Sequence, residues 1–303
     1  MYKLPTTILI EEYFSRTQQF ISTKLFPRDF AVFNDGYPYL SCETYAKSCQ
    51  IVILNRNQLI QFQNTHSKQL SKNTINSLYV DSSLISELEN IDLPSNMNIP
   101  FLIVASTDIT VECTQVVPLL TKFQKIFCVN LLGRAERIFP LPVGLENQAY
   151  RSGGKLKDFK KNYDIKVNKR KYSFTVGWNN DTNINRKSIK DTLRYLPECL
   201  FLEERVTAET LHKLYRKTLF VPSPRGNGPD SHRTWEAIYC GAVPVIKKSD
   251  FVGDISWPIY LVDEWTDLIR MNRIELEEIY SQLAMTKEES LNFSKELMNP
   301  FRN

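Results

Sequence analysis

The 303-residue sequence contains no apolar run long enough to cross a membrane, and its N-terminus has no basic region followed by an apolar one. A membrane-spanning helix needs about 18 or more apolar residues in succession, and a secretory signal peptide needs those two N-terminal regions. We therefore expect a soluble protein of the cell interior.

Histidine and closely spaced cysteines are also scarce. The three histidines are scattered, and the six cysteines form no Cys-x-x-Cys pair. A structural zinc site needs such spacing, whereas cysteines within apolar stretches are typically buried free thiols. We expect neither a metal site nor a cofactor.

Charge of one sign is not in large excess. The formal net charge is +4, and the densest basic stretch, Lys155–Lys171, has few interleaved aromatic residues. Because a nucleic-acid groove combines both features, we interpret this stretch as a solvated linker and expect no nucleic-acid partner. The sequence also lacks a P-loop and a GxGxxG motif between a strand and a helix, which counts against a dinucleotide-dependent oxidoreductase.

Short apolar strands alternate with longer amphipathic segments, a pattern typical of a mostly parallel sheet covered by helices. Helices are expected at Leu9–Lys24 and Val116–Phe123. The strands expected in the first half are Phe30–Phe33, Ile51–Leu54, Leu78–Val80, Phe101–Ala105, Ile126–Val129 and Ile138–Leu141.

The alternation restarts after a polar boundary at Ser152–Lys171 and predicts a second doubly wound domain. Its expected strands are Phe174–Val176, Leu200–Leu202, Leu219–Val221, Val243–Ile246 and Ile259–Val262, and its expected helices are Asn185–Leu196, Ala208–Arg216 and Asp230–Cys240. Two such domains would hold a ligand at the carboxyl ends of their strands.

The tail from Trp265 to Met298 carries an apolar stripe at helical spacing. Because the second sheet is complete by Val262, we expect this tail to cross back onto the N-terminal domain, against Leu9–Lys24. The expected layout is an N-terminal acceptor-side domain at 1–165, a nucleotide-sugar-binding domain at 166–264 and returning helices at 265–303.

The most informative segment covers residues 219 to 246. A buried strand runs into Pro222-Ser223-Pro224, which should continue neither a helix nor a central strand. Gly226 and Gly228 then permit close approach of a ligand, and a helix opens with Asp230 or Ser231 as its cap. A glycine-bearing loop that leads into a helix N-terminus favours binding of phosphate.

Two polar residues interrupt this otherwise apolar helix. Arg233 and Glu236 are three residues apart, so they share a face. A cation in the first turn opposes the helix dipole, which is explained if an anion binds there, and Glu236 could accept hydrogen bonds from ribose hydroxyls. A surface Arg–Glu pair of this spacing is common, but the neighbouring loop favours a binding site.

The segment SPRGNGPDSHRTWEAIYCGAVPVI resembles the C-terminal signature of the exostosin-like glycosyltransferases, in which P-x-G precedes D-x-x-R-x-x-E-A and G-x-x-P-V. FTVGWNNDTNINRK resembles the opening of the same domain, and FLIVASTDITV and RIFPLPVGLEN resemble segments of the first domain. The chain is most similar to compact stand-alone members found with surface-polysaccharide genes in bacteria and in large algal viruses.

This resemblance implies an α/β fold of GT-B type, with two facing Rossmann-like domains, and inverting transfer without a metal. The implied donor is a nucleoside diphosphate sugar, first of all a UDP-sugar such as UDP-xylose, UDP-galactose or UDP-glucuronate. The implied acceptor is a hydroxyl of a glycan. We expect a cytoplasmic location in a bacterial or virus-infected host cell, with any membrane contact peripheral.

By the same resemblance, Arg233 binds the donor diphosphate and Glu236 binds the ribose, while Asn179 and Arg186 reach the phosphates across the cleft. His232 points away from the face of Arg233 by about 100°, so helix packing is equally expected for it, and Trp235 is expected in the core. The remaining donor-site candidates are Gly177, Trp178, Pro224, Arg225, Gly226, Asn227, Gly228, Asp230 and Ser231.

Inverting transfer also needs a base that takes the proton of the acceptor hydroxyl. Three carboxylates of the N-terminal domain follow predicted strands: Asp35, Asp108 and Glu112. Asp108 is preferred because its loop resembles the corresponding loop of the family, although an Asp there could equally cap a turn. The alternative function is a non-catalytic nucleotide-sugar or glycan-binding protein on a transferase scaffold.

Overall fold

The computed structural model describes residues 36–66, 75–93, 99–106, 108–148, 155–163 and 166–301. The strand expected at Phe30–Phe33, the helix expected at Leu9–Lys24 and the candidate base Asp35 lie outside the described residues.

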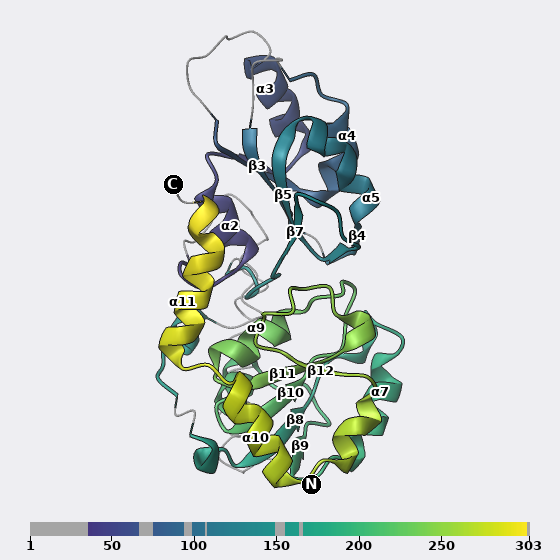
Figure 1. Ribbon diagram of the computed structural model, residues 1–303, viewed down its shortest axis with the longest axis vertical. Helices are drawn as coiled ribbons and strands as arrows, with labels where there is room; N and C mark the ends of the chain where they lie inside the picture. Colours follow the sequence, from purple (N-terminus) through teal and green to yellow (C-terminus); the bar gives the residue numbers. More distant parts are fainter. Residues whose placement is uncertain are drawn as a thin grey trace.

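The chain folds as a mixed α/β protein around two parallel sheets, one in each half (Figure 1). Among the described residues, the first sheet has the order β1-β2-β3-β5-β7, formed by Ile51–Ile53, Ser77–Asp81, Ile99–Ala105, Phe123–Val129 and Ile138–Leu141. The second has the order β12-β11-β10-β8-β9, formed by Tyr260–Val262, Val243–Lys247, Thr218–Pro222, Tyr172–Val176 and Cys199–Phe201. β4 (Val111–Glu112) and β6 (Leu131–Leu132) form a small parallel pair.

Helices connect and cover these strands. The α-helices are α2 (Cys42–Ser48), α3 (Arg56–His66), α4 (Ile85–Glu89), α5 (Cys113–Val116), α6 (Leu156–Phe159), α7 (Arg186–Thr192), α8 (Ala208–Tyr215), α9 (His232–Tyr239), α10 (Arg273–Leu283) and α11 (Lys287–Met298). The 3-10 helices are η1 (Ser82–Leu84), η2 (Val117–Thr121), η3 (Val167–Lys169), η4 (Asn180–Thr182), η5 (Leu193–Tyr195), η6 (Lys248–Asp250), η7 (Trp265–Arg270) and η8 (Asn299–Phe301). None of the helices in these ranges combines the length and the apolar character that crossing a bilayer requires.

The strand order of the second sheet reverses beside β8. β9 pairs with one edge of β8 and β10 with the other, although β9 lies between them in the chain. In an open parallel sheet, ligands bind at the carboxyl ends of the strands where the order reverses. The loop that follows β8 begins at Gly177 and the loop that follows β10 begins at Ser223. This topology therefore predicts a ligand site between these two loops.

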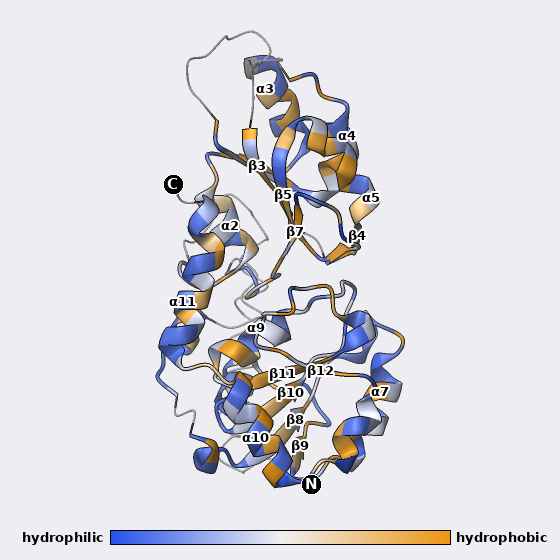
Figure 2. Cartoon of the chain, in the orientation of Figure 1, coloured by the Kyte–Doolittle hydropathy of each residue, from blue (hydrophilic) through white to orange (hydrophobic). Residues whose placement is uncertain are grey.

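One hydrophobic cluster joins the two halves. It includes Ile103 and Val129 of the first sheet, Trp235 and Tyr239 of α9, and Met298 at the end of α11. Figure 2 shows hydrophobic residues along β10 and β11, whereas α11 carries many hydrophilic ones on its visible face. The two sheets are thus packed on a common core rather than joined by polar contacts alone.

The expectation that all of 265–303 packs on the N-terminal domain is wrong for α10. Leu276 and Tyr280 are buried against the second sheet, and the Tyr280 hydroxyl donates to the carbonyl oxygen of Gly241 at 2.8 Å. That sheet has an apolar face beside β10, so α10 completes its own domain. Ile274, an apolar residue of the same tail, is 71% exposed, so it does not belong to a buried stripe.

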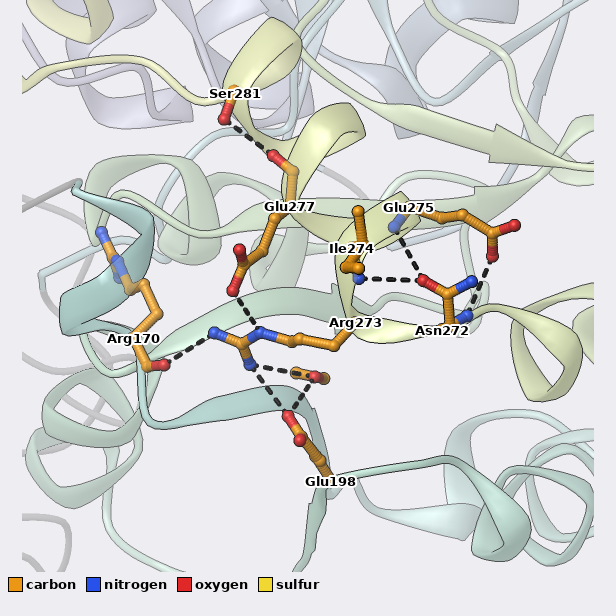
Figure 3. A network of polar contacts seen from close by, with 9 residues as sticks. Arg170, Glu198, Asn272, Arg273, Ile274, Glu275, Glu277 and Ser281 are labelled. Atoms are coloured by element: carbon orange, nitrogen blue, oxygen red, sulfur yellow. Dashed lines mark hydrogen bonds and ion pairs between the residues drawn. The ribbon is translucent and has the colours of Figure 1, made fainter.

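A polar network fixes the start of α10 (Figure 3). Asn272 caps the helix by accepting the backbone N–H groups of Ile274 and Glu275. The Arg273 guanidinium donates to Glu277 at 2.6 Å, to Glu198 at 3.1 Å and to the carbonyl oxygen of Arg170 at 3.0 Å. These contacts hold α10 on the loops next to β8 and β9.

The last helix, α11, does extend to the first half (Figure 1). The Phe301 ring, just beyond α11, lies 4.7 Å from the Phe127 ring and 6.3 Å from the Phe101 ring of the first sheet. Within α11, Ser294 hydrogen-bonds the Tyr239 hydroxyl at 2.7 Å. The segment formed by α11 and Phe301 therefore contacts both halves.

Two expected elements differ in detail. The helix expected at Val116–Phe123 is wrong, because α5 ends at Val116, a 3-10 turn follows and Phe123 begins β5. Pro118 has no N–H to donate to the preceding turn, so the α-helix cannot continue through it. Pro222, expected to stop a central strand, is the last residue of β10 and pairs with Val245, and the ladder continues through the Ser223 N–H.

We predict that Leu276→Ala lowers the free energy of unfolding by roughly 2–5 kcal/mol, because it empties a fully buried site between α10 and the second sheet. Ile274→Ala, on the exposed face of the same helix, should change it by no more than about 0.5 kcal/mol. Urea denaturation of the two variants measures the difference. Equal effects would contradict the observed packing of α10.

Candidate functional site

A pocket of about 350 Å³ lies at the carboxyl ends of β8 and β10, where the strand order reverses. Residues of both halves line it. The second half contributes Gly177, Trp178, Asn179, Thr182, Arg186, Leu202, Glu204, Arg205, Val206, Ala208, Leu211, Gly226, Asn227, Gly228, Asp230, Ser231, His232, Arg233 and Glu236, and the first half contributes Asp108, Val143 and Glu146. The structure therefore brings together most of the residues that the sequence predicts for a donor site.

The glycines of the loop after β10 are closely packed against other side chains of the protein. A Cβ at Gly228 would lie 2.7 Å from side-chain atoms of Asn130, and a Cβ at Gly226 would lie 3.1 Å from the guanidinium of Arg186. The two glycines also hydrogen-bond each other through their backbones at 3.1 Å. Their small size was expected to serve the approach of a ligand, but the Asn130 side chain already restricts position 228, and Arg186 leaves little room at position 226.

Asp230 joins the two halves at the base of the pocket. Its carboxylate accepts the backbone N–H groups of Val143 and Ser231 and the indole N–H of Trp235, each at 2.8 Å. Its own N–H donates to the Asn130 side chain at 3.0 Å. Burial raises the pKa of Asp230 to about 6, against the opposing effect of these N–H donors. Asp230, expected to bind the donor, is thus engaged within the protein.

His232 has a similar role. Its Nδ1 lies 2.8 Å from the carbonyl oxygen of Gly144 in the first half, so the ring donates a proton there. The helix α9 begins at His232 rather than at Asp230, and Ser231 occupies the N-cap position without a side-chain cap. The Ser231 hydroxyl is buried and has no hydrogen-bond partner within the described part of the chain.

Arg186 is occupied differently from the prediction. Its guanidinium donates to three carbonyl oxygens, those of Arg225 at 2.8 Å, Pro224 at 3.0 Å and Asn179 at 3.2 Å. Burial, with the charge of Arg233, lowers its pKa to about 10. Arg186 therefore ties the loop after β8 to the loop after β10, and it lines the pocket as a support instead of reaching across a cleft.

Arg233 is held in place but keeps free donors. Its Nη1 donates to the Tyr215 hydroxyl at 2.6 Å, and its guanidinium carbon lies 5.9 Å from the centre of the Trp178 ring. Its Nε has no hydrogen-bond partner among the described residues. A guanidinium has five N–H donors in a fixed plane, so Arg233 can bind an anion in the pocket without losing its present contact.

Glu236 follows one turn later with its carboxylate at the pocket wall. No ion pair joins it to Arg233 in the described ranges, but Oε1 lies 3.8 Å from Nε2 of the buried His212. Burial would raise the pKa of Glu236, but the His212 ring and the charge of Arg233 outweigh it and lower the pKa. Glu236 is therefore an ionised acceptor that faces the pocket.

The remaining predicted residues divide into two groups. Asn179 and Asn227 line the pocket, and so does Trp178, whose indole N–H donates to the carbonyl oxygen of Arg186. Arg225 and Pro224, expected to contact the donor, do not line it. Separately, Trp235 is fully buried, which confirms the expected core position.

The two candidate bases within the described residues, Asp108 and Glu112, also differ in position. Asp108 is exposed and lines the pocket from the first half. Glu112 does not line the pocket. It is the N-cap residue of α5, and its backbone N–H donates to the side-chain oxygen of Gln115. Glu146 does line the pocket and was missed, although its position after β7 was a usable signal. The described part of the chain contains no group of three His, Cys, Asp or Glu side chains placed to hold a metal ion.

Two further features were missed by sequence reasoning. The loop between β9 and α8 forms one wall of the pocket with Glu204, Arg205 and Val206. His212 of α8 lies behind Glu236. A single histidine in an amphipathic helix gives no signal of such a contact, which depends on how α8 packs on α9.

Comparisons with known proteins add little to this geometry. No protein-family model and no curated protein matches the chain. Among solved structures, a crystal structure of TarM aligns over 82% of this chain at 11% identity, with a TM-score of 0.42. The alignment spans 59% of the length of the TarM chain.

We predict that Gly228→Ala destabilises the fold by about 1–3 kcal/mol, because its methyl group overlaps the Asn130 side chain. Asn130→Ala removes the obstacle together with the hydrogen bond to Asp230. The double variant should therefore be less destabilised than the sum of the single variants, by about 0.5–3 kcal/mol. Thermal or urea unfolding of all four proteins measures this coupling, and simple additivity would contradict it.

Proposed function

We propose that this protein is a glycosyltransferase of GT-B type that binds a nucleoside diphosphate sugar in the pocket and transfers the sugar to a hydroxyl of a glycan. One observation carries the proposal. Arg233 and Glu236 line one pocket, beside a helix N-terminus, where the strand order of a parallel sheet reverses. Phosphate, sugar hydroxyls and a nucleotide match that combination.

The phosphate end of the donor is assigned to Arg233 and the start of α9. The first N–H groups of a helix have no partners within it, and its dipole favours an anion there. The unpaired hydroxyl of Ser231 adds a donor at the same place. These groups would hold the diphosphate and stabilise the charge that develops on it as it departs. The proposal needs no divalent ion.

The ribose end is assigned to Glu236. An ionised carboxylate accepts hydrogen bonds only, so it suits neighbouring hydroxyl groups and repels phosphate. Its position one helical turn beyond Arg233 separates the two recognition elements along a single face. We take the donor to be a UDP-sugar, on the resemblance of the loop and helix to the exostosin-like enzymes.

The reaction would be inverting. The acceptor oxygen attacks the anomeric carbon from the side opposite the diphosphate, and the carbon–oxygen bond to the phosphate breaks as the new glycosidic bond forms. A carboxylate of the first half takes the acceptor proton. Asp108 is assigned this role because it lines the pocket from the first half, whereas Arg233 belongs to the second half. Glu146 also lines the pocket from the first half and is the alternative base.

We predict that Arg233→Ala and Glu236→Ala each weaken UDP binding at least tenfold. Hydrogen bonds to charged groups contribute about 1.5–3 kcal/mol, and about 1.4 kcal/mol corresponds to a tenfold change. Isothermal titration in the presence of EDTA measures the affinity. Binding that appears only after Mg²⁺ or Mn²⁺ is added would contradict metal-free recognition.

A surface ion pair of the same domain provides the matched control. Arg194 and Glu203 form a 2.5 Å ion pair outside the pocket. Arg194→Ala and Glu203→Ala should leave UDP affinity unchanged. The melting temperatures of these two variants and of the two pocket variants should stay within a few degrees of the wild-type value. Normal UDP affinity in both pocket variants would sink the donor-site assignment.

We predict that Asp108→Asn lowers kcat by about 10² to 10⁴, the usual contribution of a general base, and leaves UDP affinity unchanged. Glu146→Gln should have a smaller effect. Steady-state transfer to a glycan acceptor and titration with UDP distinguish the two steps. The reverse ranking would move the base to Glu146. UDP binding without any transfer or donor hydrolysis would favour a non-catalytic sugar-binding protein.

A further inference from the structure

His212 is a buried residue without an evident structural role of its own. It lies on α8, its side chain is 0% exposed, and neither ring nitrogen has a hydrogen-bond partner in the described part of the protein. Buried polar groups in folded proteins nearly always have a partner, and an exception calls for an explanation. A simple packing role would be served equally well by an apolar side chain.

The ring is held between α6 and α9. On one side its centroid lies 4.3 Å from that of the Phe159 ring, in a tilted arrangement. On the other side its Nε2 lies 3.8 Å from Oε1 of Glu236. That separation exceeds a hydrogen bond, which joins heavy atoms at about 2.7–3.2 Å. A shift of less than about 1 Å in the Glu236 carboxylate would close it.

Glu236 approaches His212 with Oε1 and also lines the pocket. The approach of His212 Nε2 to Oε1, at 3.8 Å, is longer than an ordinary hydrogen bond. A carboxylate has two oxygens and about four acceptor positions, so one oxygen can accept from His212 while the other accepts from a ligand.

We propose that His212 is a positioning residue for ligand recognition by Glu236. When ligand hydroxyls bind the pocket-facing oxygen, the His212 Nε2–H donates to Oε1 and fixes the orientation of the carboxylate. The ribose hydroxyls of the nucleotide are the ligand groups concerned, so this inference rests on the proposed function. The phosphates, bound by Arg233 and the start of α9, do not depend on His212.

Two substitutions of similar volume test this role. His212→Met removes the N–H donor, whereas His212→Gln retains one on a side chain of comparable length. The ligands are UDP and 2′,3′-dideoxy-UDP, which lacks both ribose hydroxyls, and titration calorimetry gives both affinities. In the wild type, UDP should bind at least tenfold more tightly than the dideoxy compound.

We predict that His212→Met weakens UDP binding about tenfold and changes binding of 2′,3′-dideoxy-UDP less than twofold. His212→Gln should recover most of the UDP affinity. Phe159→Leu is the matched control, because it disturbs the packing of the same ring and leaves its N–H groups in place. It should leave the preference for UDP over the dideoxy compound unchanged.

The possible outcomes distinguish failure of the proposed role of His212 from failure of the proposed function. Equal loss of both ligands in His212→Met, or no loss of either, would show that His212 only packs the core and would overturn the inference alone. Failure of His212→Gln to recover UDP affinity would likewise overturn the inference alone. Failure of the wild-type protein to bind UDP would overturn the proposed function itself, and with it the role of His212.

Discussion

The side-by-side placement of β8 and β10 determines where the pocket lies. Their carboxyl ends meet at one edge of the second sheet, so the loop from Gly177 and the loop from Ser223 must lie close together. Arg186 then spans the gap with hydrogen bonds to the carbonyl oxygens of Pro224, Arg225 and Asn179. Without that strand order, α9 and its Arg233 would not face the loop after β8.

Sequence patterns located most of the strands, because buried parallel strands are short apolar runs that can be recognised without their neighbours. The misassigned segments depended on longer-range information. Pro222 is accommodated as the last residue of a central strand because the Ser223 N–H donates to the carbonyl oxygen of Val245. The placement of α10 depends on an uncovered face of the second sheet, which periodicity alone does not reveal.

In the candidate site, too, some features are encoded locally and others depend on distant parts of the chain. A glycine loop that leads into a helix N-terminus is encoded locally, so the pocket positions of Gly228, Arg233 and Glu236 were accessible to sequence reasoning. Their partners come from elsewhere in the chain. The contact of Gly228 with Asn130 and the approach of His212 to Glu236 depend on tertiary packing, so no local pattern could indicate them.

The charged groups around the pocket are not equivalent, and that difference argues for the assigned roles. Arg186 is committed to backbone carbonyl groups, and Asp230 to backbone N–H groups and the Trp235 indole, so they fix the shape of the pocket and connect it to the first half. Arg233 keeps an unpaired Nε, and the Glu236 carboxylate lies 3.8 Å from the nearest His212 nitrogen, beyond an ordinary hydrogen bond. A buried charge without a full set of partners is destabilising unless something else satisfies it. A ligand with an anion at one end and hydroxyls at the other would satisfy both residues, and a nucleoside diphosphate has that polarity.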